Sequence, residues 1–137
     1  MSSFLCDIVT PEALLFSEEV YFVSVPGSDG EFGVLERRAP IMSTLKLGVV
    51  RVKREEHGKD IVFAVDGGYV ESDGHKLVVL ADRAEEVGKL TLEQVREGKQ
   101  QNEHKLTSLS EDDSRAAFYH DEVSWFTLLE TQLTQGS

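Results

Sequence analysis

The sequence predicts an antiparallel β-sandwich or barrel followed by a hairpin of two α-helices. In the first part of the chain, short apolar runs rich in β-branched and aromatic residues alternate with turn residues about every ten positions. After residue 84, glycine and proline become rare and helix-forming residues dominate. We therefore expect a β domain over residues 1–84 and a helical hairpin over residues 85–137.

Strands are expected wherever an apolar run ends at turn residues. The strongest hairpin signal is Asp73-Gly74, which separates the run at 69–71 from the run at 76–80. Further strands are expected over residues 4–9, 13–16, 20–25, 49–53 and 61–65. The Gly-rich segment 27–33 carries two acidic residues, and we expect it to be a polar surface loop.

The helical part begins with a clear start signal, because Thr91 and Gln94 have the spacing of a capping box. A second helix is expected to start near Ser110, after a short turn over residues 107–110, with acidic residues at its positive end. Its apolar face is predicted from spacings of three and four residues. This face consists of Tyr119, Val123, Phe126, Leu129 and Leu133.

The first helix has a poor inward face. Its inward positions are Leu92, Val95, Lys99, Asn102 and Leu106. Two of these side chains are polar, and Gly98 costs a helix interior about 1 kcal/mol relative to alanine. We therefore expect the hairpin to be a weakly docked, mobile and regulatory element.

Composition narrows the possible partners. The 137 residues carry a formal net charge of −11, so the surface repels phosphate backbones and anionic head groups. No apolar run approaches the roughly 18 residues that span a bilayer. We expect no nucleic-acid binding and no direct lipid insertion. The single cysteine and the absence of a secretory signal pattern predict a cytoplasmic protein, or one peripheral to a membrane from that side.

No catalytic or metal-binding pattern is present in the sequence. His57, His75, His104 and His120 stand apart in hydrophilic stretches and are expected at the surface. Cys6 is expected to be a small core residue. The Gly-rich segment lacks the Lys-Ser/Thr pair of a phosphate-binding loop. We expect no catalytic site, no metal and no cofactor.

Several ordered motifs point to one family. They are Gly27-Ser28-x-Gly30-Glu31-x-Gly33, Ala39-Pro40, Leu47-Gly48-x-Val50-Arg51, Gly67-Gly68-Tyr69-Val70-Glu71 and Val79-Leu80-Ala81-Asp82-x-Ala84. With this spacing the chain resembles the epsilon subunit of bacterial F-type ATP synthases over nearly all of residues 4–84. The helical half is similar mainly in length and two-helix layout.

The resemblance implies a β-sandwich of roughly ten strands and a non-catalytic role in the central stalk. The subunit would lie at the foot of the gamma subunit, against the ring of c subunits, on the cytoplasmic side of the bacterial cell membrane. There it would couple rotation of the ring to ATP synthesis. In many bacteria the hairpin can also extend along gamma towards the alpha–beta head and inhibit ATP hydrolysis.

The resemblance also implies particular residues. The loop that meets the c ring corresponds to Gly30, Glu31 and Phe32, and Arg38 would flank this contact. The family usually has Pro-Gly-His where this chain has Glu36-Arg37-Arg38.

Nucleotide binding is a second implied property. Some members bind ATP in the hairpin through a pattern similar to Leu-Asp-x-x-Arg-Ala with arginines on the second helix. Here Arg96 and Arg115 are the matching candidates, while Glu97 would oppose a phosphate. An alternative function stays open on the sequence alone, because a free-standing β-sandwich adaptor with a helical tail explains the same composition.

Overall fold

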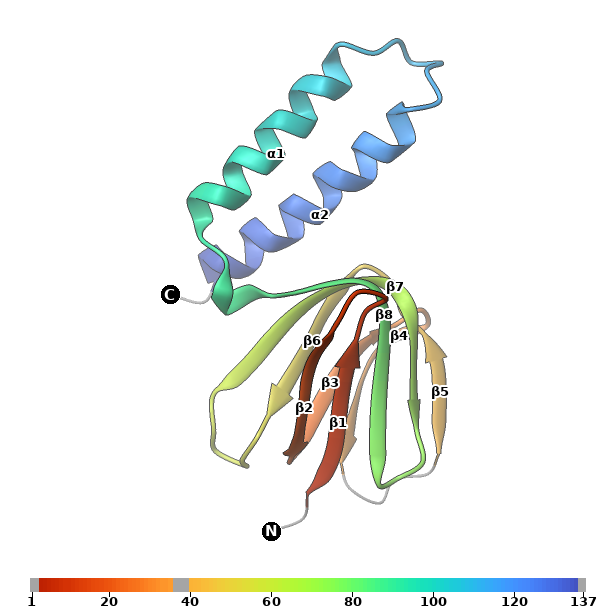
Figure 1. Cartoon of the computed structure of the whole chain (residues 1–137), viewed down its shortest axis with the longest axis vertical. Coiled ribbons are helices and arrows are strands. Elements are labelled where there is room, and N and C mark those ends of the chain that lie inside the picture. The colour runs from red at the N-terminus through yellow and green to blue at the C-terminus, as the bar shows by residue number, and fades with distance from the viewer. Residues whose placement is uncertain (1–2, 36–39, 136–137) are drawn as a thin grey trace. The chain divides into compact units, whose positions relative to one another are not determined.

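The computed structural model describes residues 3–35 and 40–135, which form a β unit ending at Glu86 and a helical unit beginning at Val87 (Figure 1). The strands are β1 (Phe4–Val9), β2 (Leu14–Val20), β3 (Phe22–Gly27), β4 (Gly30–Leu35), β5 (Ile41–Thr44), β6 (Gly48–Lys53), β7 (Asp60–Ser72) and β8 (Lys76–Glu86). The helices are η1 (Val87–Lys89), α1 (Leu92–Thr107) and α2 (Ala116–Gln135). The predicted fold class, a β-sandwich followed by two helices, is confirmed.

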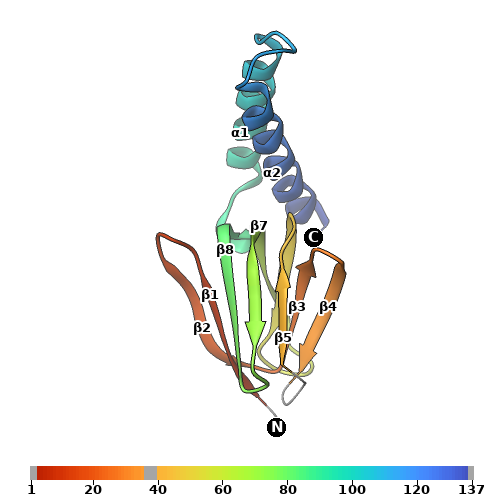
Figure 2. The ribbon, with the colours of Figure 1, turned by 90° about the vertical axis from the view of Figure 1, so that its right-hand side faces the viewer.

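The strands form one hydrogen-bonded sheet in the order β2-β1-β8-β7-β6-β3-β4, with β5 paired to β7. Strands β1 and β8 are parallel, and the other pairs are antiparallel. The ribbon views show this sheet folded back on itself as a sandwich (Figures 1 and 2). The buried core between the layers is made of Phe4, Cys6, Ile8, Phe16, Val20, Val23, Val25, Val34, Leu45, Val50, Val52, Phe63, Val65, Val70, Leu77, Val79 and Ala81.

Strand β7 is continuous where the sequence predicted a stop. Its first part pairs with β6 and its last part pairs with β5, while β8 pairs with it from Phe63 to Ser72. Gly67 and Gly68 lie where β7 passes from one pairing to the other, with φ of +74° and +104°, values that favour glycine. Because β7 and β8 each take part in both layers, the described residues form eight strands instead of the roughly ten that were expected.

The turn between β7 and β8 confirms the hairpin predicted at Asp73-Gly74. The Asp73 carboxylate accepts hydrogen bonds from the backbone N–H groups of His75 and Lys76, at 2.8 and 2.9 Å. These two bonds lower the pKa of Asp73. The carboxylate therefore holds the turn in the way typical of an Asx turn.

The Gly-rich segment is mostly strand, so the expected surface loop over residues 27–33 is wrong. Two glycines of this segment leave room for neighbouring aromatic rings. A Cβ atom at Gly33 would lie 2.5 Å from the Phe22 ring, and one at Gly27 would lie 2.7 Å from the Phe32 ring. Each ring therefore occupies space that a side chain at the glycine would fill.

Cys6 confirms its expected place in the core. It is fully buried, and burial together with the charge of Asp7 raises the pKa of its thiol to about 12. A thiol that stays protonated at neutral pH is a poor nucleophile.

The first helix starts as predicted and the second starts later. The Thr91 Oγ1 accepts a hydrogen bond from Gln94 N, and the Gln94 side chain accepts one from Thr91 N, so the capping box is confirmed. Helix α2 begins at Ala116 instead of near Ser110. Asp113 explains the delay, because its carboxylate accepts the N–H of Arg115 at 2.9 Å and keeps this segment in turns.

Candidate functional site

The first candidate surface is the tip of the β3–β4 hairpin. Gly27 pairs with Gly30 across a turn made by Ser28 and Asp29, and Gly30 has a φ of +136°. The tip is tied to the end of β5. The N–H of Ser28 donates to the carbonyl of Thr44 at 2.9 Å, and their two hydroxyl groups lie 2.6 Å apart. These bonds make the tip a well-positioned turn.

The residues assigned to the c-ring contact have different environments in this hairpin. Gly30 makes the turn, and Phe32 is half-buried and packs against the sandwich core. The Glu31 side chain is exposed. Within residues 3–35 and 40–135, no cation lies at ion-pair distance from its carboxylate. Arg38 lies outside the described residues. Glu31 is thus an exposed acidic group of the hairpin, and Ser28 and Asp29 are exposed polar residues of its turn.

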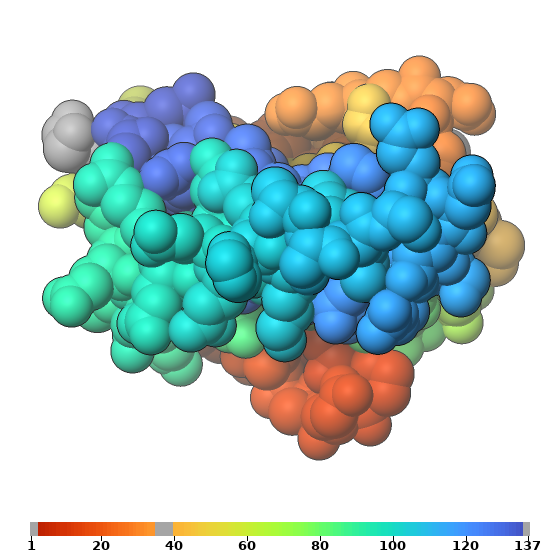
Figure 3. All heavy atoms as spheres, turned by 90° about the horizontal axis from the view of Figure 1, so that it is seen from above, coloured from red at the N-terminus to blue at the C-terminus, as the bar shows by residue number. Residues whose placement is uncertain are grey.

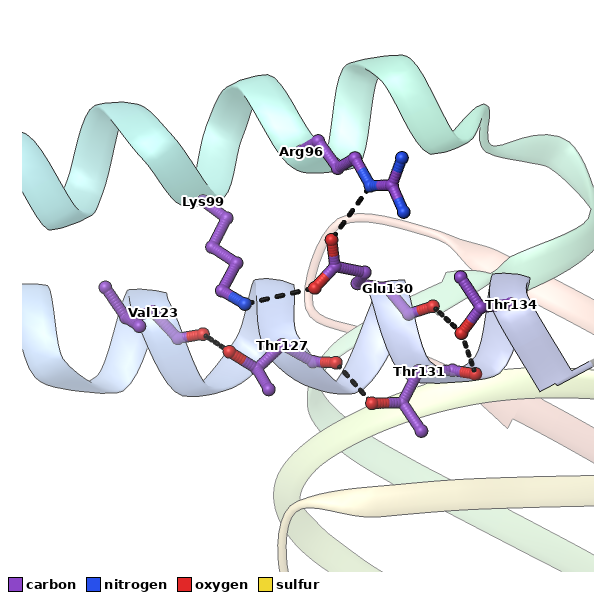
Figure 4. A network of polar contacts seen from close by, with 7 residues as sticks. All are labelled: Arg96, Lys99, Val123, Thr127, Glu130, Thr131 and Thr134. Atoms are coloured by element: carbon purple, nitrogen blue, oxygen red, sulfur yellow. Dashed lines mark hydrogen bonds and ion pairs between the residues drawn. The ribbon is translucent and has the colours of Figure 1, made fainter.

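The second candidate surface is the helical hairpin, which carries an ion network between α1 and α2 (Figure 4). Glu130 on α2 accepts hydrogen bonds from Lys99 Nζ at Oε1 and from Arg96 Nε at Oε2, both 3.0 Å long. These bonds, that from Lys99 first, lower the pKa of Glu130. The inward position of Lys99 therefore serves an ion pair between the helices. The sequence pattern had counted this polar residue only as a weakness of the face.

The side chains of α1 and α2 meet along the hairpin (Figure 3). On α1, Val95 is buried, and Leu92, Asn102 and Leu106 are half-buried, as the inward face required. On α2, Leu129 is buried, and the rest of the proposed apolar face is half-buried, namely Tyr119, Val123, Phe126 and Leu133. Trp125 is 1% exposed although it lies outside that face. Trp125 is therefore a buried residue that periodicity alone did not assign.

Gly98 has a packing role that the sequence did not reveal. A Cβ atom there would lie 2.5 Å from Cε1 and 2.6 Å from Cζ of the Phe126 ring. The Asn102 side chain also donates a 2.8 Å hydrogen bond to the Gly98 carbonyl. The glycine thus allows α1 and α2 to approach closely where Phe126 packs.

Gly98→Ala is accordingly expected to destabilise the hairpin. In an open helix this change stabilises by about 1 kcal/mol, but here the new methyl group forces the Phe126 ring to move, at a cost of about 1–3 kcal/mol. Amide hydrogen exchange across α1 and α2 measures the balance. Adding Phe126→Leu is expected to restore part of the loss. An alanine variant that slows exchange would show that the packing of Phe126 against α1 does not require a glycine at position 98.

The candidate nucleotide residues are not brought together. Arg115 precedes α2 and pairs with Asp113, at 3.0 Å from Nε to Oδ1 and 2.7 Å from Nη2 to Oδ2. The hydrogen bonds from Arg115 lower the pKa of Asp113 to about 2. Arg96 lies in the first half of α1, so in an antiparallel hairpin the two arginines are at opposite ends. They cannot hold one phosphate group together in this conformation.

The histidines lie at the surface, as expected: His57, His75, His104 and His120 are all exposed. In the described part of the chain, no group of three or more His, Cys, Asp or Glu side chains could hold a metal ion. No helix of the described residues is both long and apolar enough to cross a membrane.

Comparisons with known proteins agree with the motifs. Residues 3–87 match the family model described as ATP synthase, Delta/Epsilon chain, beta-sandwich domain. The ATP synthase epsilon chain of Desulforamulus reducens is 45% identical over 102 residues, which cover 74% of this chain and 76% of that protein. The epsilon chain of Desulfitobacterium hafniense strain Y51 is 36% identical over 115 residues, 84% of this chain and 86% of that protein.

Solved structures show the same fold. A chain in the cryo-EM structure of the Euglena gracilis mitochondrial ATP synthase (OSCP/F1/c-ring, rotational state 1) has a TM-score of 0.78 at 18% identity, covering 97% of this chain and 82% of that one. The resemblance inferred from the sequence is therefore confirmed, and the chain belongs to the ATP synthase epsilon-chain family, as a non-catalytic subunit of that complex.

Proposed function

We propose that the β unit binds the gamma subunit and the c ring on the cytoplasmic side of the bacterial cell membrane, and that it couples ring rotation to ATP synthesis. The observation that carries the contact with the ring is the exposed Glu31 carboxylate at a turn held by backbone hydrogen bonds. An acid on a positioned turn can pair with basic or amide groups of a partner, and such pairs set register and specificity. The coupling role itself is supported by membership in the family.

The helical unit is proposed to regulate ATP hydrolysis by contact with gamma and the alpha–beta head. Its second helix and the preceding turn are acidic. Residues 111–135 contain Glu111, Asp112, Asp113, Asp121, Glu122 and Glu130 against Arg115 alone. Arg115 is already paired with Asp113. Because like charges do not steer partners together, contact with an acidic surface would have to rest on apolar side chains, among them the 59%-exposed Phe118.

The proposed ring contact is tested by Glu31→Lys. Since Glu31 is exposed, we expect the free energy of unfolding to change by no more than about 0.5 kcal/mol. The reversed charge is expected to weaken the coupling of proton flow to ATP synthesis in reconstituted vesicles. Loss of folding stability with unchanged coupling would make Glu31 a structural residue.

A matched control is Glu56→Lys. Glu56 is also exposed, and it lies in the turn between β6 and β7. The end of β6 pairs with the start of β3, so this turn is at the other end of the sandwich from Glu31. We expect the control to leave coupling unchanged. An equal loss of coupling in both variants would show that the change in net charge, and not a specific contact of Glu31, causes the loss.

A further inference from the structure

Glu130 is placed unusually for an acidic residue of this chain. Between Val123 and Gln135 it is the sole charged side chain of α2. Both of its carboxylate oxygens are engaged by cations of α1, Lys99 at one and Arg96 at the other. The side chains of Glu130 and Lys99 are each 25% exposed, so the pair is partly withdrawn from water. One carboxylate thus joins two helices through two charge-assisted hydrogen bonds.

Lys99 has a possible partner on its own helix that it does not use. Glu103 lies four residues after Lys99, a favourable spacing for an ion pair within a helix. The structure instead directs the Lys99 ammonium across to α2. The pairing therefore serves the contact between the helices.

Three threonine hydroxyl groups near Glu130 on α2 are engaged within their own helix. The hydroxyl groups of Thr127, Thr131 and Thr134 donate to carbonyls of their own helix (Figure 4). Such bonds leave these hydroxyl protons unavailable to α1. Among the hydrogen bonds drawn around Glu130, only its own two cross between the helices.

We propose that Glu130 is an electrostatic latch that holds α2 on α1, so that removing its charge releases the second helix. Without that charge, Arg96 and Lys99 lie one turn apart and lose their counter-ion on α2, and like charges on one helix face repel. The apolar contacts around Gly98, Val95 and Leu129 then hold the hairpin alone. The consequence for the enzyme rests on the proposed function: the latch would set how readily the hairpin opens to act on the alpha–beta head.

The latch is tested with the full-length chain carrying Glu130→Gln, which keeps the side-chain shape and removes the charge. We expect amide hydrogen exchange in α2 to become about tenfold faster, because hydrogen bonds to charged groups are the stronger ones. Exchange in the β unit serves as the internal reference and is expected to stay unchanged. Trp125, the one tryptophan of the chain, is buried on α2 and should shift its fluorescence to longer wavelength.

Two further variants make the result specific. Glu97→Gln removes an equal charge from an exposed position on α1 and is expected to leave exchange in α2 unchanged. The inverted set Arg96→Glu, Lys99→Glu and Glu130→Lys is expected to restore slow exchange. Equal exchange in the Glu130→Gln and Glu97→Gln variants, or no recovery in the inverted set, would overturn the latch.

The latch and the proposed function can fail separately. Hydrogen exchange on the isolated chain reports only the latch. ATP hydrolysis by the assembled enzyme with the Glu130→Gln chain then reports the regulatory role. An open hairpin without any change in hydrolysis would support the latch and reject regulation by the helical unit.

Discussion

Replacing Gly68 by alanine is expected to lower the free energy of unfolding of the β unit by about 3–5 kcal/mol. A Cβ atom at this position would overlap the carbonyl oxygen of Leu80 and would lie 2.9 Å from Cα of Ala81. Both are backbone atoms of the paired strand β8, so they cannot swing away as the end of a side chain can. The φ of +104° adds strain for any residue that has a side chain.

Urea unfolding followed by circular dichroism measures this loss. Gly88→Ala is the matched control, because a Cβ atom at Gly88 meets nothing within 4 Å. We expect the control to change stability by no more than about 0.5 kcal/mol. If the two variants unfold at the same urea concentration, β7 does not pass Leu80 as closely as described.

Removing the helical unit is expected to leave the β unit folded and to abolish any inhibition of ATP hydrolysis that the hairpin exerts. Every residue of the sandwich core lies between Phe4 and Ala81. A chain that ends at Glu86 therefore keeps the whole core and should unfold cooperatively. Heteronuclear NMR spectra and urea unfolding of the shortened chain test its folding.

The same shortened chain tests the hairpin in the assembled enzyme. ATP hydrolysis is compared between enzyme assembled with the full chain and with the chain ending at Glu86. We expect the shortened chain to give the faster hydrolysis. A disordered NMR spectrum would contradict the independence of the β unit, whereas equal hydrolysis rates would contradict only regulation by the hairpin.

Much of the β unit was predictable because its signals are local. Alternating apolar residues and the Asp73-Gly74 turn determine strand positions from near neighbours. The continuity of β7 was not predictable in this way. Gly67-Gly68 is usually a stop, and here it is instead the place where the strand passes between layers, which depends on the distant partners β5 and β6.

In the helical unit, too, the features that depend on distant partners could not be predicted from the sequence. The capping box of Thr91 was predictable, since it involves two residues three positions apart. The later start of α2 depends on hydrogen bonds of Asp113 that compete with the helix. The roles of Gly98 and Glu130 depend on which side chains of the opposite helix face them, and the sequence of one helix does not contain that information.

The proposed contact of Glu31 followed from the resemblance to the family. The structure adds that its neighbour Gly30 forms part of the turn and that Phe32 packs against the core. Arg96 and Arg115 were paired in the nucleotide hypothesis because both match basic positions of a pattern. Their separation became evident only from the antiparallel arrangement of α1 and α2, in which each arginine is held by a carboxylate.

If this chain is held in the stalk through its β unit, it should bind the gamma subunit encoded in the same genome with or without its helices. Tagged full-length chain and tagged chain ending at Glu86 are each mixed with gamma and analysed by size-exclusion chromatography. We predict that both forms elute as a complex with gamma at similar affinity. Gamma that elutes apart from both forms would show that the β unit does not bind it.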